Sequence, residues 1–176
     1  VLSTVQNNRD HRKITVIDGE TAFTGGINLK DAYINAEVKY GYWKDTVIRL
    51  HGDAVRSFTF MFLQVWHLYD NNIHIEYKRY FPKAIKNVDG FVIPYCDTPL
   101  DSDNTGESVY LDLLYNAKQY VHIMTPYLIL DHEMLTALKF AAERGIDVRI
   151  MMPGVPDKSS AFAVAKTYYP ELLQAG

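Results

Sequence analysis

The chain has 176 residues, and its 18 basic and 21 acidic side chains give a formal net charge of −3. With 48% apolar and 13% aromatic residues it can build a packed core, which excludes a disordered chain. The acidic balance provides no basic field for nucleic acid, the single Cys96 excludes an internal disulfide, and no apolar run reaches the ~18 residues of a membrane span.

The first half has the pattern of a β-hairpin followed by a strand and a helix. Residues 13–17 and 20–24 are β-rich and flank Asp18-Gly19, a two-residue hairpin turn, and residues 46–51 predict another strand. Apolar residues at helical spacing then predict a helix, and we expect its aromatic side chains to pack in the core rather than enter a membrane. This stripe is Val55, Phe58, Phe62, Val65, Trp66 and Tyr69.

The second half alternates strands with helices. The pattern weakens at residues 71–89, which predicts a linker between a first domain of residues 1–82 and a second of residues 90–176. Predicted strands lie at residues 91–96, 120–124 and 146–152, and the periodic segments after them predict helices. This alternation predicts βαβ units, so the expected fold class is α/β, a mixed sheet flanked by helices.

The first residues that point to chemistry are His11 and Lys13. They stand two apart at the start of a predicted strand, so their side chains are expected on one face of the sheet. An imidazole can attack phosphorus or shuttle a proton, and an ammonium stabilises phosphoryl oxygens. Gly25 and Gly26 allow close backbone approach or positive φ, and Asn28 offers a second donor. The combination predicts a phosphodiester site.

Asp18 has the opposite parity and occupies the predicted turn, so from the residues alone we expect it to fix the turn or an interface. The joint pattern resembles the signature of the phospholipase D superfamily, which includes this aspartate among its catalytic positions. The pattern is His11-x-Lys13, four residues, Asp18, six residues, Gly25-Gly26-x-Asn28. Three further segments, residues 25–29, 41–46 and 125–127, are similar to bacterial cardiolipin synthases.

The resemblance implies a phospholipase D-type lobe and a mechanism. In the family the histidine of the first signature is the usual nucleophile, so His11 would attack phosphatidylglycerol and form a phosphohistidine. A second phosphatidylglycerol would then displace the enzyme and give cardiolipin. Lys13 and Asn28 would hold the phosphoryl oxygens, so that neither a metal nor a cofactor is needed.

Two further residues are expected near this site. Asp45 lies where the family has a carboxylate against Nδ1 of the nucleophilic histidine, and a strand-capping role is the alternative. Tyr127 is expected to bind substrate together with Gly25 and Gly26, with a core tyrosine as the alternative. The acidic loop at residues 101–106 has part of a calcium-loop spacing but lacks its closing glutamate, so we expect a solvated loop.

The family carries two signatures, one in each repeated lobe, whereas no other histidine here has a lysine two residues on. The chain is therefore expected to be a fragment with half an active site, built from the end of one repeat and the start of the next. Its parent is expected at the bacterial cell membrane, with this part soluble on the cytoplasmic side and no nucleic acid as partner. A hydrolase or nuclease active as a homodimer, and an inert fragment that exchanges domains, are the alternatives.

Overall fold

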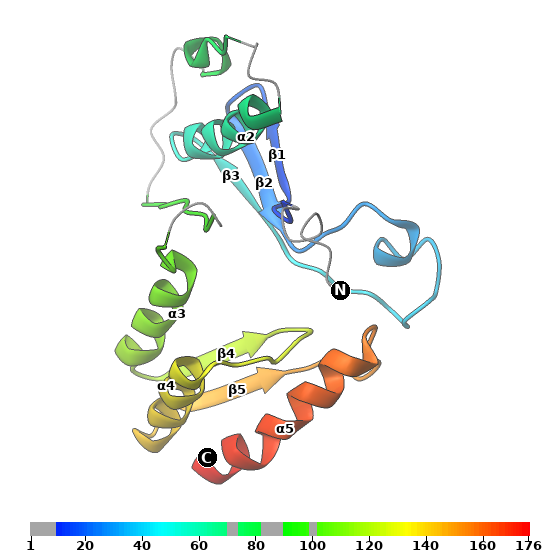
Figure 1. The fold of residues 1–176 in the computed structure, drawn as a ribbon, viewed down its shortest axis with the longest axis vertical. Helices are drawn as coiled ribbons and strands as arrows, with labels where there is room; N and C mark the ends of the chain where they lie inside the picture. The colour runs from blue at the N-terminus through cyan, green and yellow to red at the C-terminus, as the bar shows by residue number, and fades with distance from the viewer. Residues whose placement is uncertain (1–9, 70–73, 82–89, 99–101) are drawn as a thin grey trace. The chain divides into compact units, whose positions relative to one another are not determined.

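The computed structural model describes residues 10–69, 74–81, 90–98 and 102–176. The chain forms two compact units, Val1–Tyr95 and Cys96–Gly176. Each unit has its own small sheet and its own helices (Figure 1), which confirms the expected α/β class. Most of the predicted linker at residues 71–89 lies outside the described residues. The part that is described contains a short 3-10 helix, η2 (Tyr77–Tyr80).

The first unit contains a three-stranded antiparallel sheet with the order β1-β2-β3. These strands are β1 (Ile14–Ile17), β2 (Thr21–Gly25) and β3 (Val47–His51), close to the predicted ranges. Asp18, Gly19 and Glu20 connect β1 to β2, because Ile17 pairs with Thr21, and Asp18 and Gly19 have φ values of 55° and 69°. Two successive residues at positive φ, closed by the Glu20 amide donating to the Ile17 carbonyl at 3.1 Å, are what a type I′ turn requires, so the turn at Asp18-Gly19 is confirmed, with a connection one residue longer than predicted. A 3-10 helix, η1 (Asp31–Tyr33), lies in the long connection from β2 to β3.

Helix α2 (Val55–Tyr69) packs against β1 and β2. Val55 and Phe58 are buried as predicted, but Phe62 and Trp66 are 50% and 52% exposed. The expectation that the whole aromatic stripe is core is therefore wrong for these two residues. The three short strands cover only part of the helix, and its buried side is completed by Thr59, Met61 and Leu63 instead. The Thr59 hydroxyl donates to the Val55 carbonyl at 3.0 Å, which satisfies the buried oxygen.

Residues 91–96 do not form the predicted strand. They have no strand assignment and pair with no other strand of the described chain, and Phe91 and Ile93 are 100% and 84% exposed. An apolar run becomes a strand only when a neighbouring strand satisfies its backbone groups, and none of the described strands lies against this run.

The second unit is a βαβ unit with two additional helices, and it confirms the predicted alternation. Strands β4 and β5 are parallel, and helix α4 connects them (Figure 1). The elements are α3 (Thr105–Asn116), β4 (Tyr120–Met124), α4 (His132–Glu143), β5 (Asp147–Met151) and α5 (Ser159–Ala175). Within the described ranges, no helix combines the length and the hydropathy needed to span a bilayer.

Local signals set the ends of α4. The Asp131 carboxylate accepts a hydrogen bond from the Met134 amide at 2.7 Å, which is an N-cap, and Gly145 follows the helix at a φ of 87°. The core forms where α4 meets its neighbours, around Leu114, Ala137 and Leu138. The partly buried residues around this centre are Leu111, Val121, Ile123, Leu130, Met134, Val148, Ile150 and Leu172.

Candidate functional site

The register of the first sheet gathers most of the predicted site residues at one of its ends. Ile14 pairs with Thr24, so the residues just before β1 and just after β2 lie at the same end. Gly25 pairs with Val47, which brings the residues just before β3 to that end as well. The residues gathered there are His11, Lys13, Gly25, Gly26, Asn28 and Asp45. Asp18 follows the last residue of β1 and lies at the opposite end, roughly 13 Å away for four residues of strand.

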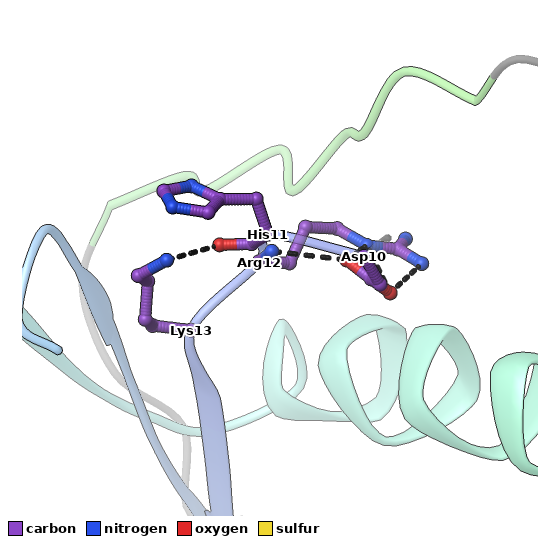
Figure 2. A network of polar contacts seen from close by, with 4 residues as sticks. All are labelled: Asp10, His11, Arg12 and Lys13. Carbon is purple, nitrogen blue, oxygen red and sulfur yellow. Dashed lines mark hydrogen bonds and ion pairs between the residues drawn. The ribbon is translucent and has the colours of Figure 1, made fainter. Parts of the chain in front are cut away.

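His11 and Lys13 lie in the segment that leads into β1 rather than within the strand. Figure 2 shows their side chains on one side of the backbone, and those of Asp10 and Arg12 on the other. The Lys13 ammonium donates to the main-chain carbonyl of His11 at 2.6 Å, while the imidazole is exposed. The exposed imidazole of His11 and the ammonium of Lys13 therefore face the same side of this segment.

Asp10 and Arg12 form an ion pair on the other side of this segment. The Arg12 guanidinium lies 2.7 Å from Asp10 Oδ2, and the Arg12 amide donates to Asp10 Oδ1 at 2.9 Å. The side-chain hydrogen bond from Arg12 holds the pKa of the Asp10 carboxyl below its ordinary value of 3.8. The pair bridges the residue between them, so it restricts the backbone that carries His11.

Gly25 and Gly26 pack directly against the beginning of β3. The Gly26 amide donates to the Thr46 carbonyl at 3.1 Å. A β-carbon on Gly25 would overlap that same carbonyl oxygen, and a β-carbon on Gly26 would overlap Oδ1 of Asp45. Of the two roles expected for these glycines, close approach therefore applies, and the group approached is the protein's own chain. Their role in substrate binding stays a prediction.

The Asp45 carboxylate is half-buried and accepts a hydrogen bond from the Trp43 indole N–H at 2.9 Å. Asn35 fixes Trp43 in turn, because its side-chain amide donates to the Trp43 carbonyl at 2.8 Å and accepts from the Trp43 amide at 2.7 Å. The Tyr33 ring lies 4.6 Å from the Trp43 ring between centroids. In the part of the chain that the structure describes, no hydrogen bond joins Asp45 to His11, so that pairing stays a prediction.

Asn28 and Tyr127 complete the predicted set. Asn28 is half-buried, and its main-chain carbonyl accepts from the Lys30 amide at 3.0 Å. Tyr127 belongs to the second unit, where its hydroxyl donates to Asp157 Oδ2 at 2.6 Å. It is half-buried rather than a fully enclosed core residue.

The second unit contains three acidic side chains that lie close enough together to bind a cation. Glu107, Asp131 and Glu133 offer carboxylate oxygens that lie within 4.8 Å of one another. Two of them already have a structural partner, since Asp131 caps α4 and Glu107 accepts from the side-chain Nδ2 of Asn104 at 3.2 Å. The acidic loop at residues 101–106 lies partly outside the described residues, and its last residue, Gly106, donates its amide to the Asp97 carboxylate at 3.0 Å.

Several residues of these sites were not identified from the sequence. The Trp43 segment contributed to the family resemblance, but nothing in the sequence assigned its indole to Asp45. Asn35 has a φ of 60°, which asparagine tolerates better than most residues. This preference would suggest a role for Asn35 only after the conformation of the loop is known. Asp157 and Lys158 follow a predicted strand, which is a position where ligand-binding side chains are common in α/β folds.

Comparisons with known proteins agree with this fold. The family model described as "Cardiolipin synthase, PLD-like domain" matches residues 110–176, which include β4, α4, β5 and α5. An uncharacterized protein of Streptococcus mutans is 56% identical over 99% of this chain and 38% of its own length. The cardiolipin synthase of Alkalihalophilus pseudofirmus is 40% identical over 97% of this chain and 34% of its own length. Cardiolipin synthase 2 of Bacillus anthracis is 38% identical over 100% of this chain and 34% of its own length.

Residues 110–176 are a phospholipase D-like domain, since the matched family model agrees with their α/β fold. Over nearly its whole length the chain is similar to two proteins named cardiolipin synthase. It spans about a third of the length of the curated relatives that it matches, 34% in two of them.

Proposed function

We propose that this chain is part of a cardiolipin synthase, an enzyme that transfers a phosphatidyl group from one phosphatidylglycerol to another. The relatives that carry that name support the substrate class. The observation that supports the chemistry best is the common side of His11 and Lys13, with the 2.6 Å contact of the ammonium to the His11 carbonyl (Figure 2). An exposed imidazole next to a cation suits attack on an anionic diester.

In the proposed first step a ring nitrogen of His11 forms a bond to phosphorus, and the bond from phosphorus to the glycerol oxygen breaks. The departing glycerol oxygen takes a proton from the histidine of a second His-x-Lys signature, and this sequence contains such a signature only at His11. In the second step a hydroxyl of another phosphatidylglycerol attacks the phosphorus, loses its proton, and the phosphorus–nitrogen bond breaks. The products are cardiolipin and glycerol.

The neighbouring residues would support these steps. Lys13 and Asn28 would donate to the phosphoryl oxygens as negative charge grows on them. Asp45 would hold the imidazole through Nδ1 in the tautomer that leaves the other nitrogen free to attack. The tight contacts of Gly25 and Gly26 with residues 45–47 would keep Asn28 and Asp45 at the same end of the sheet. Since only one signature is present, this chain would supply half of the active site.

The proposed mechanism is tested by detecting the covalent intermediate on His11. The complete protein that carries this chain is mixed with labelled phosphatidylglycerol, quenched within a turnover, and digested for mass spectrometry. We expect a phosphatidyl adduct on His11 in the wild type and none in His11→Ala. His67→Ala serves as the control, since His67 lies in the last turn of α2 and has no role in the proposed mechanism.

The same preparation separates the proposed activity from the nuclease alternative. Plasmid DNA and phosphatidylglycerol vesicles are offered to equal amounts of enzyme, and cleavage and cardiolipin are both measured. Plasmid cleavage without any cardiolipin would reject the proposed function. Release of phosphatidic acid as the main product would identify water as the acceptor and make the enzyme a hydrolase.

A further inference from the structure

Two loops of the second unit extend from the same edge of its sheet. Residues 125–131 follow β4 and residues 152–158 follow β5, and the two parallel strands point to the same end of the unit (Figure 1). In open α/β sheets the carboxyl ends of parallel strands are where ligands bind, because the loops there carry polar side chains beyond the core. A second polar site is therefore expected at these two loops.

Three polar side chains meet at this edge. The Tyr127 hydroxyl donates to Asp157 Oδ2 at 2.6 Å, and both residues are half-buried. The Lys158 ammonium lies 4.9 Å from the centre of the Tyr127 ring. An anionic acceptor and a cation thus both contact one aromatic residue. A carboxylate has about four lone-pair positions, so the phenol leaves capacity for further donors.

The loop that carries Tyr127 is held in place on both sides of the tyrosine. The Thr125 amide extends the β4–β5 pairing by donating to the Met151 carbonyl at 3.2 Å, and the Thr125 hydroxyl donates to the Tyr127 carbonyl at 3.2 Å. Further along, the Tyr168 hydroxyl of α5 donates to the Leu130 carbonyl at 2.9 Å. A polar group held by such contacts keeps its position without a ligand, which is what a binding site needs.

We propose that Tyr127, Asp157 and Lys158 form a subsite for the phosphoglycerol headgroup of the acceptor lipid, an inference that rests on the function proposed above. The Asp157 carboxylate accepts hydrogen bonds from the glycerol hydroxyls, and Tyr127 orients that carboxylate. Lys158 faces the phosphate that neighbours the glycerol. A bare phosphate alone suits the subsite less well, because the carboxylate would repel it. Asp157 and Lys158 are thus specificity residues, and Tyr127 is a positioning residue.

The experiment compares two soluble acceptors in the complete protein. Vesicles of phosphatidylglycerol are the donor, and isotopically labelled glycerol or ethanol is the acceptor. Label in phosphatidylglycerol and formation of phosphatidylethanol then give kcat/KM for a polyol and for a monohydroxy alcohol. The loss of one charge-assisted hydrogen bond predicts that Asp157→Asn lowers the glycerol-to-ethanol ratio of kcat/KM by roughly tenfold, mainly through KM. Tyr127→Phe lowers this ratio by a smaller factor. Lys158→Gln lowers kcat/KM for phosphatidylglycerol as the acceptor, so that phosphatidylglycerol also competes less well with ethanol.

Tyr168→Phe is the matched control, because it also removes a tyrosine hydrogen bond that ties the same loop. It should lower thermal stability about as much as Tyr127→Phe and leave the acceptor ratio unchanged. An unchanged ratio in Asp157→Asn and Tyr127→Phe, with wild-type turnover intact, would overturn the subsite. If Asp157→Asn does not fold, wild-type acceptor behaviour in both Tyr127→Phe and Lys158→Gln would overturn it instead. A wild-type protein that transfers to no alcohol at all would reject the proposed function, and the subsite with it.

Discussion

Gly26 lies so close to the carboxylate of Asp45 that a β-carbon at position 26 would overlap Oδ1. The same carboxylate accepts the Trp43 indole N–H at 2.9 Å through its other oxygen. Asp45 is therefore enclosed between a glycine on one side and a tryptophan on the other. The position of the Asp45 side chain therefore depends on both neighbours, and a substitution of Gly26 or Trp43 should alter the proposed active site.

Gly26→Ala is expected to displace the Asp45 side chain and break its bond to Trp43. Because the overlapped atom is the end of a side chain that can rotate away, the expected cost is that of the lost Trp43–Asp45 hydrogen bond, about 1 kcal/mol, which chemical denaturation followed by tryptophan fluorescence can measure. Gly154→Ala is the control, since a β-carbon there would meet no atom within 4 Å. Equal stability of the two variants would contradict the close packing at Gly26.

The role of Asp45 can be separated from that of Trp43. If Asp45 orients His11, Asp45→Asn should slow phosphohistidine formation by roughly 10²–10⁴-fold, as happens when a histidine loses its orienting carboxylate. Trp43→Phe keeps the carboxylate and most of the aromatic packing, so a loss of tenfold or less is expected. Quench-flow measurement of the adduct gives both rates. Similar losses in the two variants would assign Asp45 a purely structural role.

Much of this fold could be predicted from local patterns. The Asp18-Gly19 turn needs positive φ at two successive residues, and few other dipeptides allow that so readily. Asp131 and Gly145 bound α4 because capping groups act on neighbouring amides and carbonyls, which are local in sequence. Signals of this kind do not depend on the rest of the protein.

Features that depend on distant partners were harder to predict. The run at residues 91–96 has the composition of a strand, yet whether it pairs is decided by another segment. Phe62 and Trp66 continue a helical stripe, but their burial depends on how wide a sheet α2 covers. For the site, spacing identified His11 and Lys13, while the partners of Asp45 and Tyr127 come from contacts across loops that spacing does not encode.

The ion pair next to His11 should be visible in a titration. The Arg12 hydrogen bond lowers the pKa of Asp10 in the folded protein. The contribution of this pair to the free energy of unfolding is therefore fully present above the ordinary pKa of 3.8, and it is lost as the pH falls through the lower pKa of the folded state. Carboxyl-detected NMR should therefore give an Asp10 midpoint below 3.8. In Arg12→Gln the midpoint should move back toward the ordinary value. Since both side chains are about a third exposed, the pair contributes about 0.5 kcal/mol or less.

Arg144 should be important for the stability of the second unit. Its guanidinium donates to the carbonyls of Tyr115, Leu114 and Ala117 at 2.6, 3.1 and 3.0 Å, which are acceptors at the end of α3. Arg144→Met should lower the free energy of unfolding by about 1–3 kcal/mol. Arg56→Met removes only an exposed ion pair of 3.6 Å and should change stability by less than about 0.5 kcal/mol. Urea titrations of both variants give the comparison, and an equal effect would show that the carbonyl contacts contribute nothing.

The isolated chain should fold but show little turnover as a monomer. Phosphatidyl transfer needs a proton donor for the departing glycerol, and no second histidine–lysine pair exists in this sequence to supply it. A missing general acid alone lowers a rate by roughly 10²–10⁴-fold. Cardiolipin formation is measured across a dilution series while light scattering reports the mass of the particles. Activity that appears only where dimers form would mean that two chains complete one site, whereas full activity of monomers would show that His11 and its neighbours need no partner histidine.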